Sequence, residues 1–216
     1  MKIACVGYRN WALRIYRNIQ KVSEHEFLFI ENEVDFSEKK IYEFKPDLVL
    51  FYGWSKIISD EIIQDFICLM LHPSDLPKYR GGSPIQNQII NGVEQTKISI
   101  FRINSEIDAG DIVAKAPLDL SGSLNDIFER ITDAGTKLTI EFLSNGMEFS
   151  PQDHSQATYY KRRRPEESEI TIHELQNCNS KYLFNKIRML DDPYPNAFIA
   201  CSDGKKIYLK KVELED

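Results

Sequence analysis

Two short stretches of the chain hold residues whose types and spacing could do chemistry. In the first, His72 follows an apolar run, at the carboxyl end of a predicted strand, where open α/β sheets bind their ligands. In the second, Asp108 lies in a tight turn between two predicted strands. A histidine with a distant carboxylate could be a base and its orienting partner in acyl transfer. The alternative is purely structural: Asp108 forms the turn and His72 bonds the backbone, and spacing alone favours it.

The elements before the histidine predict the first part of a parallel sheet. Short apolar runs at residues 2–6, 27–30, 47–51 and 67–71 read as strands. A helix-spaced pattern covers residues 11–19, and Ser59 can cap a short helix through Phe66. Strands that alternate with helices imply right-handed crossovers. We therefore expect an α/β fold with a Rossmann-like, doubly wound, mostly parallel sheet.

The chain after the histidine predicts more of this sheet and then a small appendage. Ser83 and Pro84 open a helix, and residues 97–103 and 112–118 read as strands. The spacing of Ser123 and Asp126 is that of a capping box ahead of a helix to residue 143. After about residue 150 the composition becomes polar, then basic and then mixed. We expect one domain over residues 1–150 and a small C-terminal α+β subdomain over 151–216, with a β-hairpin at 197–201 and 206–210.

Composition and charge exclude several classes of protein. The chain has 216 residues, 24 aromatic side chains (12 Phe, 10 Tyr, 2 Trp) and a net charge of -6, so it is neither disordered nor a coat for phosphate backbones. Neither a signal peptide nor an apolar run of about 20 residues is present. We expect a cytoplasmic protein without membrane or nucleic-acid partners. No metal site is expected, since no Cys/His cluster occurs, and the scattered Cys5, Cys68, Cys178 and Cys201 are expected to be free thiols, three of them buried in apolar runs.

The stretches that contain His72 and Asp108 resemble those of the 10-formyltetrahydrofolate-dependent formyltransferases. That family carries N-x-H-P-S-L-L-P-x-x-R-G, then P-I-Q, then D-x-G-D-I, and this chain carries His72-Pro73-Ser74 through Arg80-Gly81, Pro84-Ile85-Gln86 and Asp108-Ala109-Gly110-Asp111-Ile112. A second stretch, from Thr158-Tyr159-Tyr160 to Asp192-Pro193-Tyr194-Pro195, resembles the region after the catalytic domain of sugar N-formyltransferases. Methionyl-tRNA formyltransferases carry a more distant version of it.

The resemblance implies formyl transfer from 10-formyltetrahydrofolate to an amine. His72 matches the family's catalytic histidine, which handles the amine proton, and Asp108 matches the aspartate that keeps it oriented and charged. The folate would lie between the end of the strand at His72 and the turn at 105–108. The resemblance thus implies folate-binding residues Tyr52, Trp54, Leu71, Ser74, Leu76, Ser105, Ile107 and Asp108, and we assign substrate binding to Arg9, Asn10, Trp11, Lys78, Arg80, Gly81 and Tyr160.

One position departs from the family pattern. The family's asparagine, two residues before the histidine, donates a hydrogen bond to the oxyanion, and Met70 stands there. A thioether donates no hydrogen bond, and losing one such donor can cost roughly 3–4 kcal/mol. Gln86, Asn87 or Asn104 could replace it, protonated His72 could serve alone, or the chain could be a catalytically silent homologue that still binds folate or sugar.

The acceptor amine is the remaining question. Glycinamide ribonucleotide formyltransferases open with G-x-G-S-N, whereas this chain has Gly7-Tyr8-Arg9-Asn10-Trp11 with a single glycine. Methionyl-tRNA formyltransferases carry a basic C-terminal domain, and this acidic chain is expected to bind tRNA poorly. An amino sugar, linked to a nucleotide and used in surface glycans, fits best. The run Lys161 to Arg164 could bind its phosphates, although a solvated linker is the favoured interpretation. The C-terminal hairpin could pair between the subunits of a homodimer.

Overall fold

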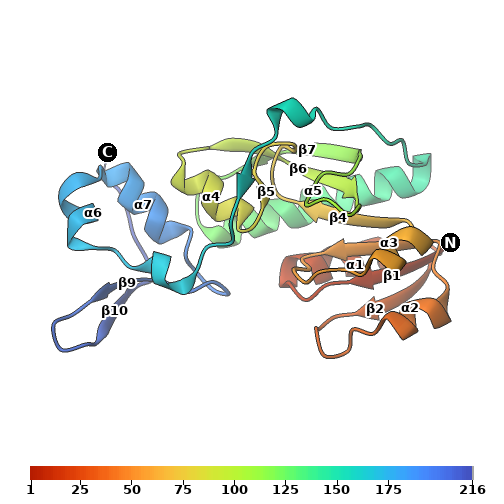
Figure 1. Cartoon of the computed structure of the whole chain (residues 1–216), viewed down its shortest axis with the longest axis horizontal. Coiled ribbons are helices and arrows are strands. Elements are labelled where there is room, and N and C mark those ends of the chain that lie inside the picture. The colour runs from red at the N-terminus through yellow and green to blue at the C-terminus, as the bar shows by residue number, and fades with distance from the viewer. Residues whose placement is uncertain (216) are drawn as a thin grey trace.

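A six-stranded sheet forms the centre of the computed structural model, which describes residues 1–215 (Figure 1). The strand order is β2-β1-β3-β4-β6-β7, with β1 to β4 parallel and β6 antiparallel to both of its neighbours. The bounds are β1 (Lys2–Val6), β2 (Glu26–Ile30), β3 (Leu48–Tyr52), β4 (Cys68–His72), β6 (Gln95–Arg102) and β7 (Ile112–Asp119). The predicted α/β fold with a mostly parallel sheet is confirmed.

Helices cover both faces of the sheet because its central strands are apolar on both sides. Ile3 and Cys5 of β1 pack in one hydrophobic cluster, and the intervening Ala4 and Val6 pack in a second. The first cluster includes α1, α4 and α5, and the second includes α2 and α3. The helices are α1 (Asn10–Lys21), α2 (Glu38–Phe44), α3 (Asp60–Asp65), α4 (Pro84–Ile90) and α5 (Leu124–Asn145).

The C-terminal part lies at one end of the long axis, opposite the N-terminal strands (Figure 1). It carries the expected antiparallel hairpin of β9 and β10, and Ile170, Met189 and Ala197 share the first hydrophobic cluster with the sheet. A two-stranded parallel pair, β5 with β8, ties residues 80–81 to 159–160, so the proposed boundary near residue 150 precedes a segment that packs on the first part. The elements are β5 (Arg80–Gly81), β8 (Tyr159–Tyr160), α6 (Ile172–Asn177), α7 (Ser180–Arg188), β9 (Ala197–Ala200), β10 (Lys206–Leu209) and the 3₁₀ turns η1 (His154–Gln156) and η2 (Pro165–Ser168).

Several local predictions can be compared with the structure. The caps at Ser59 and Ser123 are confirmed, since each hydroxyl accepts a backbone N–H of its helix. Ser83 precedes α4 as expected but does not cap it, because its backbone is left-handed (φ 51°) and its hydroxyl accepts from Arg163 N instead. All four cysteines are free, and Cys5 and Cys68 are buried, whereas Cys201 is only half-buried, contrary to prediction. In residues 1–215 no helix is long and apolar enough to cross a membrane.

The C-terminal part contains a buried ion pair. Lys186, only 4% exposed, places Nζ 2.5 Å from Glu174 Oε1 and also donates to the Glu169 carbonyl. Burial raises the pKa of the Glu174 carboxyl, but the hydrogen bonds from Lys186 and from Thr171 outweigh it, so the pKa lies below the ordinary 4.5. A lowered carboxyl pKa contributes stability at neutral pH that is lost as the pH falls through and below the ordinary value.

Glu174→Gln is expected to lower the free energy of unfolding by about 3 kcal/mol at neutral pH, because it leaves the buried Lys186 ammonium without its counter-charge. The difference from the wild type should shrink as the pH falls below the ordinary carboxyl pKa, because the lowered pKa of Glu174 contributes less stability there. Urea unfolding across this pH range measures both effects. The exposed Glu166→Gln is the control, and a difference that stays constant with pH would contradict the assignment.

Candidate active site

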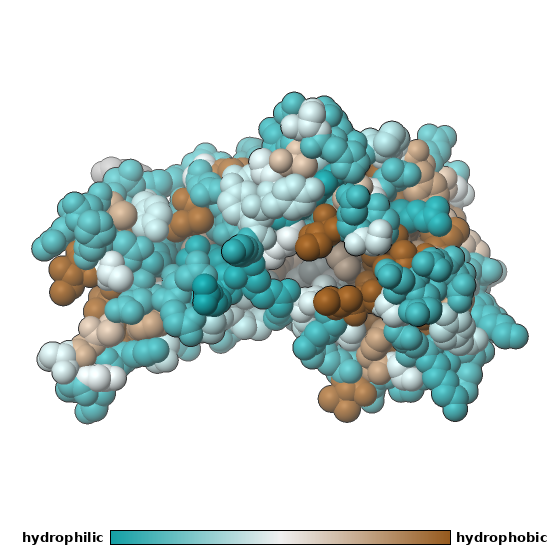
Figure 2. All heavy atoms as spheres, viewed as in Figure 1, coloured by the Kyte–Doolittle hydropathy of each residue, from teal (hydrophilic) through white to brown (hydrophobic). Residues whose placement is uncertain are grey.

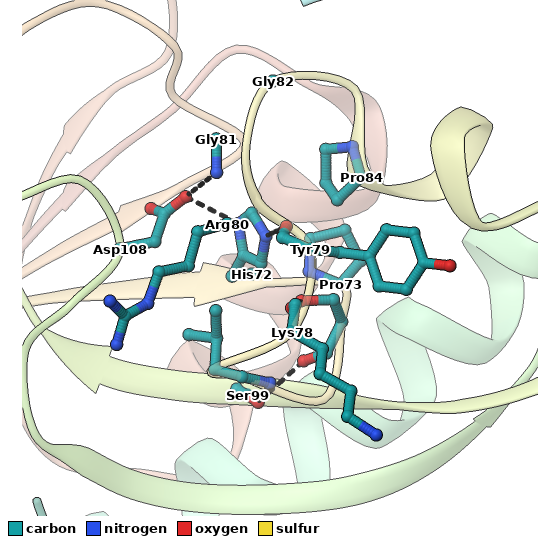
Figure 3. Close-up of polar contacts among 12 residues, drawn as sticks. His72, Pro73, Lys78, Tyr79, Arg80, Gly81, Gly82, Pro84, Ser99 and Asp108 are labelled. Carbon is teal, nitrogen blue, oxygen red and sulfur yellow. Dashed lines mark hydrogen bonds and ion pairs between the residues drawn. The ribbon is translucent and has the colours of Figure 1, made fainter. Parts of the chain in front are cut away.

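His72 is the last residue of β4, and its ring is held by a backbone carbonyl. The residue is 5% exposed, and Nε2 lies 2.8 Å from the carbonyl oxygen of Tyr79 (Figure 3). Because a carbonyl can only accept, Nε2 carries a proton and donates. Tyr79 turns this carbonyl toward the ring from a left-handed backbone (φ 59°). Nδ1 is therefore the ring nitrogen left to exchange a proton.

Asp108 meets this ring from the connection between β6 and β7. Its Oδ2 lies 3.5 Å from His72 Nδ1 (Figure 3). In the sheet register, β6 ends at Arg102 beside Leu69, three residues before His72, a separation of roughly 10 Å along the strand. The connection must therefore fold back along β4, and Asp108 ends in a left-handed conformation (φ 49°). Together, Tyr79 and Asp108 offer an acceptor to each nitrogen of a protonated ring.

Gly81 fixes the same carboxylate from the other side. Its N–H donates to Asp108 Oδ2 at 2.7 Å (Figure 3). A Cβ at this position would lie 2.4 Å from the carbonyl oxygen of Tyr160, and the backbone has φ 94°. Only glycine fits such a close approach with a left-handed backbone. The glycine of the Arg80-Gly81 pair thus allows the loop to hold Asp108 while pairing with β8.

A buried network around Arg80 supports the Asp108 turn. Arg80 is fully buried, and its Nη2 donates to Gln152 Oε1 at 2.7 Å while Nη1 donates to the Tyr159 hydroxyl at 2.8 Å. Gln152 Nε2 in turn donates to the carbonyls of Asp108 (3.0 Å) and Gly110 (2.6 Å). Gln152 is not among the residues predicted for the site, because nothing in its local sequence indicates that it contacts residues more than 40 positions before it.

A cleft of about 940 Å³ opens at His72 and Asp108. Figure 2 shows this face of the molecule hollowed near its centre, with hydrophobic residues at the margin of the hollow. The lining combines apolar side chains such as Met70, Phe101 and Ile107 with five cationic residues and three carboxylates. Although the whole chain carries a net charge of -6, the cleft has an excess of positive charge and suits an anionic ligand with a flat apolar part. The charged lining residues are Arg9, Lys56, Lys161, Arg162, Arg163, Asp60, Glu106 and Asp108.

Most predicted site residues line this cleft, and some do not. Tyr52 is fully buried with its hydroxyl 3.0 Å from Thr139 Oγ1, and the Ser74 hydroxyl donates to the Lys78 carbonyl. Leu76 is also buried, and Asn10 and Lys78 are exposed elsewhere. The residues at the cleft are Arg9, Trp11, Trp54, Leu71, His72, Gly81, Gln86, Asn104, Ser105, Ile107, Asp108 and Tyr160, and those away from it are Asn10, Tyr52, Ser74, Leu76, Lys78, Arg80 and Asn87.

The basic run differs from its favoured interpretation as a solvated linker. The pairing of β8 with β5 lays residues 158–162 along the loop that follows His72, and Gly82 N–H donates to the Tyr160 carbonyl at 2.8 Å. Lys161, Arg162 and Arg163 consequently line the cleft. In residues 1–215, Lys161 and Arg162 have no carboxylate within ion-pair distance. These two cations are therefore available to a ligand.

Comparisons with known proteins show which families and chains are similar to this one. A family described as formyl transferase matches residues 20–143, and one described as methionyl-tRNA formyltransferase, C-terminal domain, matches residues 165–216. The methionyl-tRNA formyltransferase of Kosmotoga olearia is 34% identical over 157 residues, which are 69% of this chain and 49% of that protein. The chain spans about half the length of the curated relatives it matches.

Two solved structures illustrate the likeness in fold. A methionyl-tRNA formyltransferase from Clostridium thermocellum is 33% identical with a TM-score of 0.83, and 96% of each chain is covered. A sugar N-formyltransferase from a Shewanella species is 16% identical with a TM-score of 0.77, covering 100% of this chain and 99% of its own. At that identity the second likeness concerns the fold alone.

Proposed function

The chain belongs to the formyl transferase family, and from this premise we propose that its cleft transfers a formyl group from 10-formyltetrahydrofolate to an amine. The observation that carries the proposal is the pairing of His72 Nδ1 with Asp108 Oδ2 at 3.5 Å, in a cleft large enough for a folate. His72 and Asp108 are 36 positions apart in the sequence. If each residue only formed its own turn, nothing would require the two side chains to lie next to each other. Their convergence supports a catalytic role.

His72 acts on the amine proton in this proposal. Its Nε2–H is held by the Tyr79 carbonyl, so Nδ1 exchanges a proton with the ligand. Asp108 stabilises the protonated ring electrostatically, and Gly81 N–H keeps its carboxylate in place. An amine must lose a proton as it attacks a formyl carbon, and the ring accepts it.

The residues of the cleft fit a folate. Trp54 Nε1 and Gln86 Nε2 are buried donors without a hydrogen-bond partner in residues 1–215, and both residues line the cleft. Such orphaned donors cost free energy until an acceptor arrives, and the ring and formyl oxygens of a folate are acceptors. The apolar lining suits the flat ring. When bound, 10-formyltetrahydrofolate supplies the formyl carbon.

For the acceptor we propose an amino sugar linked to a nucleotide. Arg9, Lys161 and Arg162 lie at the cleft, and among residues 1–215 none has a carboxylate partner. Arginine and lysine bind phosphate through charge-assisted hydrogen bonds. The Arg162 guanidinium also reaches Ser55 Oγ at 3.4 Å, across the cleft from its own segment. A diphosphate near the mouth would place a sugar amine deeper, toward His72.

Methionyl-tRNA is the second candidate acceptor. The observation that favours it is that curated relatives at 30–34% identity carry the name methionyl-tRNA formyltransferase. The same cations would meet the phosphates of an acceptor stem. Both candidates use one reaction on one cleft, and they differ in what surrounds the amine. A silent homologue that binds folate without transfer is the third alternative.

A panel of amines separates these candidates. The chain is incubated with 10-formyltetrahydrofolate and nucleotide-linked amino sugars, methionyl-tRNA or glycinamide ribonucleotide, and the products are weighed by mass spectrometry. We expect one amino sugar to gain the mass of one CO unit, and Lys161→Ala with Arg162→Ala to raise its KM about tenfold while kcat stays within a few-fold. Gain on methionyl-tRNA alone would replace the proposed acceptor. Folate binding without any gain would support a silent pocket.

A further inference from the structure

The oxyanion donor expected of this family is missing from β4. Met70 and His72 are two residues apart on the strand, so their side chains leave the same face of the sheet, and both line the cleft. The thioether of Met70 can donate no hydrogen bond. A formyl oxygen that gains negative charge beside His72 therefore needs a donor from another element.

Gln86 of α4 offers such a donor. The residue is 2% exposed, lines the cleft and leaves Nε2 without a hydrogen-bond partner among residues 1–215. Buried side-chain amides are almost always hydrogen-bonded in folded proteins, and a buried donor without a partner costs about 1–3 kcal/mol. A buried amide without a hydrogen-bond partner at a cleft is suited to donate to an acceptor atom of a bound ligand.

The other two amides near the cleft are already engaged or solvated. Asn87 Nδ2 donates to the carbonyls of Gly82 (2.9 Å) and Lys161 (3.4 Å), and Asn87 does not line the cleft. Asn104 is exposed, and its Oδ1 accepts from Glu106 N at 3.0 Å. Among the three candidate residues, Gln86 alone combines burial, a place in the cleft and an unpartnered donor.

The helix that carries Gln86 is fixed next to the histidine. Two residues further on, Gln88 Nε2 donates to the carbonyl of Pro73, the residue that follows His72, at 2.8 Å. Gln88 is fully buried, and its Oε1 accepts from Thr96 Oγ1 at 2.6 Å. These bonds hold α4 against the end of β4. The position of the Gln86 amide relative to His72 is therefore set by the fold.

We propose that Gln86 Nε2 donates the hydrogen bond to the formyl oxygen that Met70 does not supply, an inference that rests on the proposed formyl transfer. In that reaction the amine nitrogen forms a bond to the formyl carbon, and the bond from this carbon to N10 of the folate breaks. The amine loses one proton and N10 gains one. Gln86 neither gains nor loses a proton. Its hydrogen bond stabilises the negative charge that develops on the formyl oxygen.

A double-variant experiment tests the role of Gln86 by complementation. Gln86→Ala is expected to lower kcat about 100-fold, with the Kd for 5,8-dideazafolate, which carries no formyl group, within a few-fold of the wild type. The double variant, with Met70→Asn added to Gln86→Ala, should regain at least about tenfold in kcat, because the asparagine restores a donor. A merely structural glutamine would not be rescued from β4.

Two outcomes would overturn the inference in this experiment. One is a kcat for Gln86→Ala within a few-fold of the wild type. The other is a double variant that folds, as judged by its melting temperature, yet is no faster than Gln86→Ala. Both outcomes are judged by comparison with a wild-type protein that transfers the formyl group.

A binding measurement decides the question without turnover. The wild type is expected to bind 10-formyl-5,8-dideazafolate about tenfold more tightly than 5,8-dideazafolate, since only the first carries a formyl oxygen, and Gln86→Ala should lose this preference. If the wild type transfers no formyl group, the proposed function fails while this ratio still tests Gln86. A preference unchanged in Gln86→Ala, or the absence of binding to the wild type, would overturn the inference.

Discussion

His72→Ala is expected to lower kcat for formyl transfer by about 10⁴-fold, the largest effect of any single substitution in this chain. The ring is the one group in the cleft whose nitrogen, Nδ1, faces a carboxylate and can take the amine proton. Alanine removes the proton acceptor and also leaves the Asp108 charge without its partner. The measurement is single-turnover transfer under saturating donor and acceptor, which reports the chemical step.

Two controls distinguish a loss of catalysis from a loss of folate binding and from a general effect of replacing a histidine. The Kd for 10-formyl-5,8-dideazafolate should stay within a few-fold of the wild type, because His72 is not expected to carry folate affinity. His173→Ala, at an exposed histidine of α6, should transfer at the wild-type rate. A His72→Ala protein that is folded and retains even a tenth of the wild-type rate would contradict the role of the ring.

Asp108→Asn is expected to lower kcat by about 10³-fold. The amide oxygen can still accept from Gly81 N–H, so the turn keeps its geometry. What is lost is the negative charge 3.5 Å from His72 Nδ1, which favours the protonated ring that forms during proton transfer. Single-turnover transfer under saturating donor and acceptor measures this loss beside the wild type.

Asp111→Asn is the matched control from the same turn. Asp111 is exposed, and its backbone carbonyl accepts from Arg102 N. We expect kcat within a few-fold of the wild type. Equal losses in the two variants would assign the effect to the turn as a whole rather than to the carboxylate next to the ring.

The sheet was predictable from local sequence, but helices α2, α6 and α7 were not. Each buried strand is a continuous apolar run, because helices cover both faces. Of these three helices, α2 buries only Ile41, and the rest of Glu38–Phe44 is polar or half-buried. A segment with one apolar anchor carries too little periodicity to distinguish a helix from a loop.

The convergence of His72 and Asp108 was predictable, and the residues that support them were not. His72 and Asp108 stand in motifs, so the resemblance identified them before the fold was known. The basic run reaches the site through long-range pairing of β8 with β5, some 79 residues apart at Arg80 and Tyr159. Gln152 follows Ser150, which forms an isolated antiparallel bridge with Ile112. Such pairing is determined by tertiary packing, which no local pattern encodes. Tertiary packing also explains why Tyr52 does not line the cleft. Tyr52 ends β3 at the edge of the sheet where α/β proteins bind ligands, but its hydroxyl lies buried against Thr139.

The most direct test of formyl transfer follows the formyl group itself. The chain is mixed with 10-formyltetrahydrofolate carrying an isotope-labelled formyl carbon and with a nucleotide-linked amino sugar, and the sugar is weighed beside the His72→Ala protein. We predict that the wild type places the label on the sugar amine and releases tetrahydrofolate in equal amount, and that His72→Ala does neither. Label that stays on the folate with every amine tested, while the folate binds, would contradict the account.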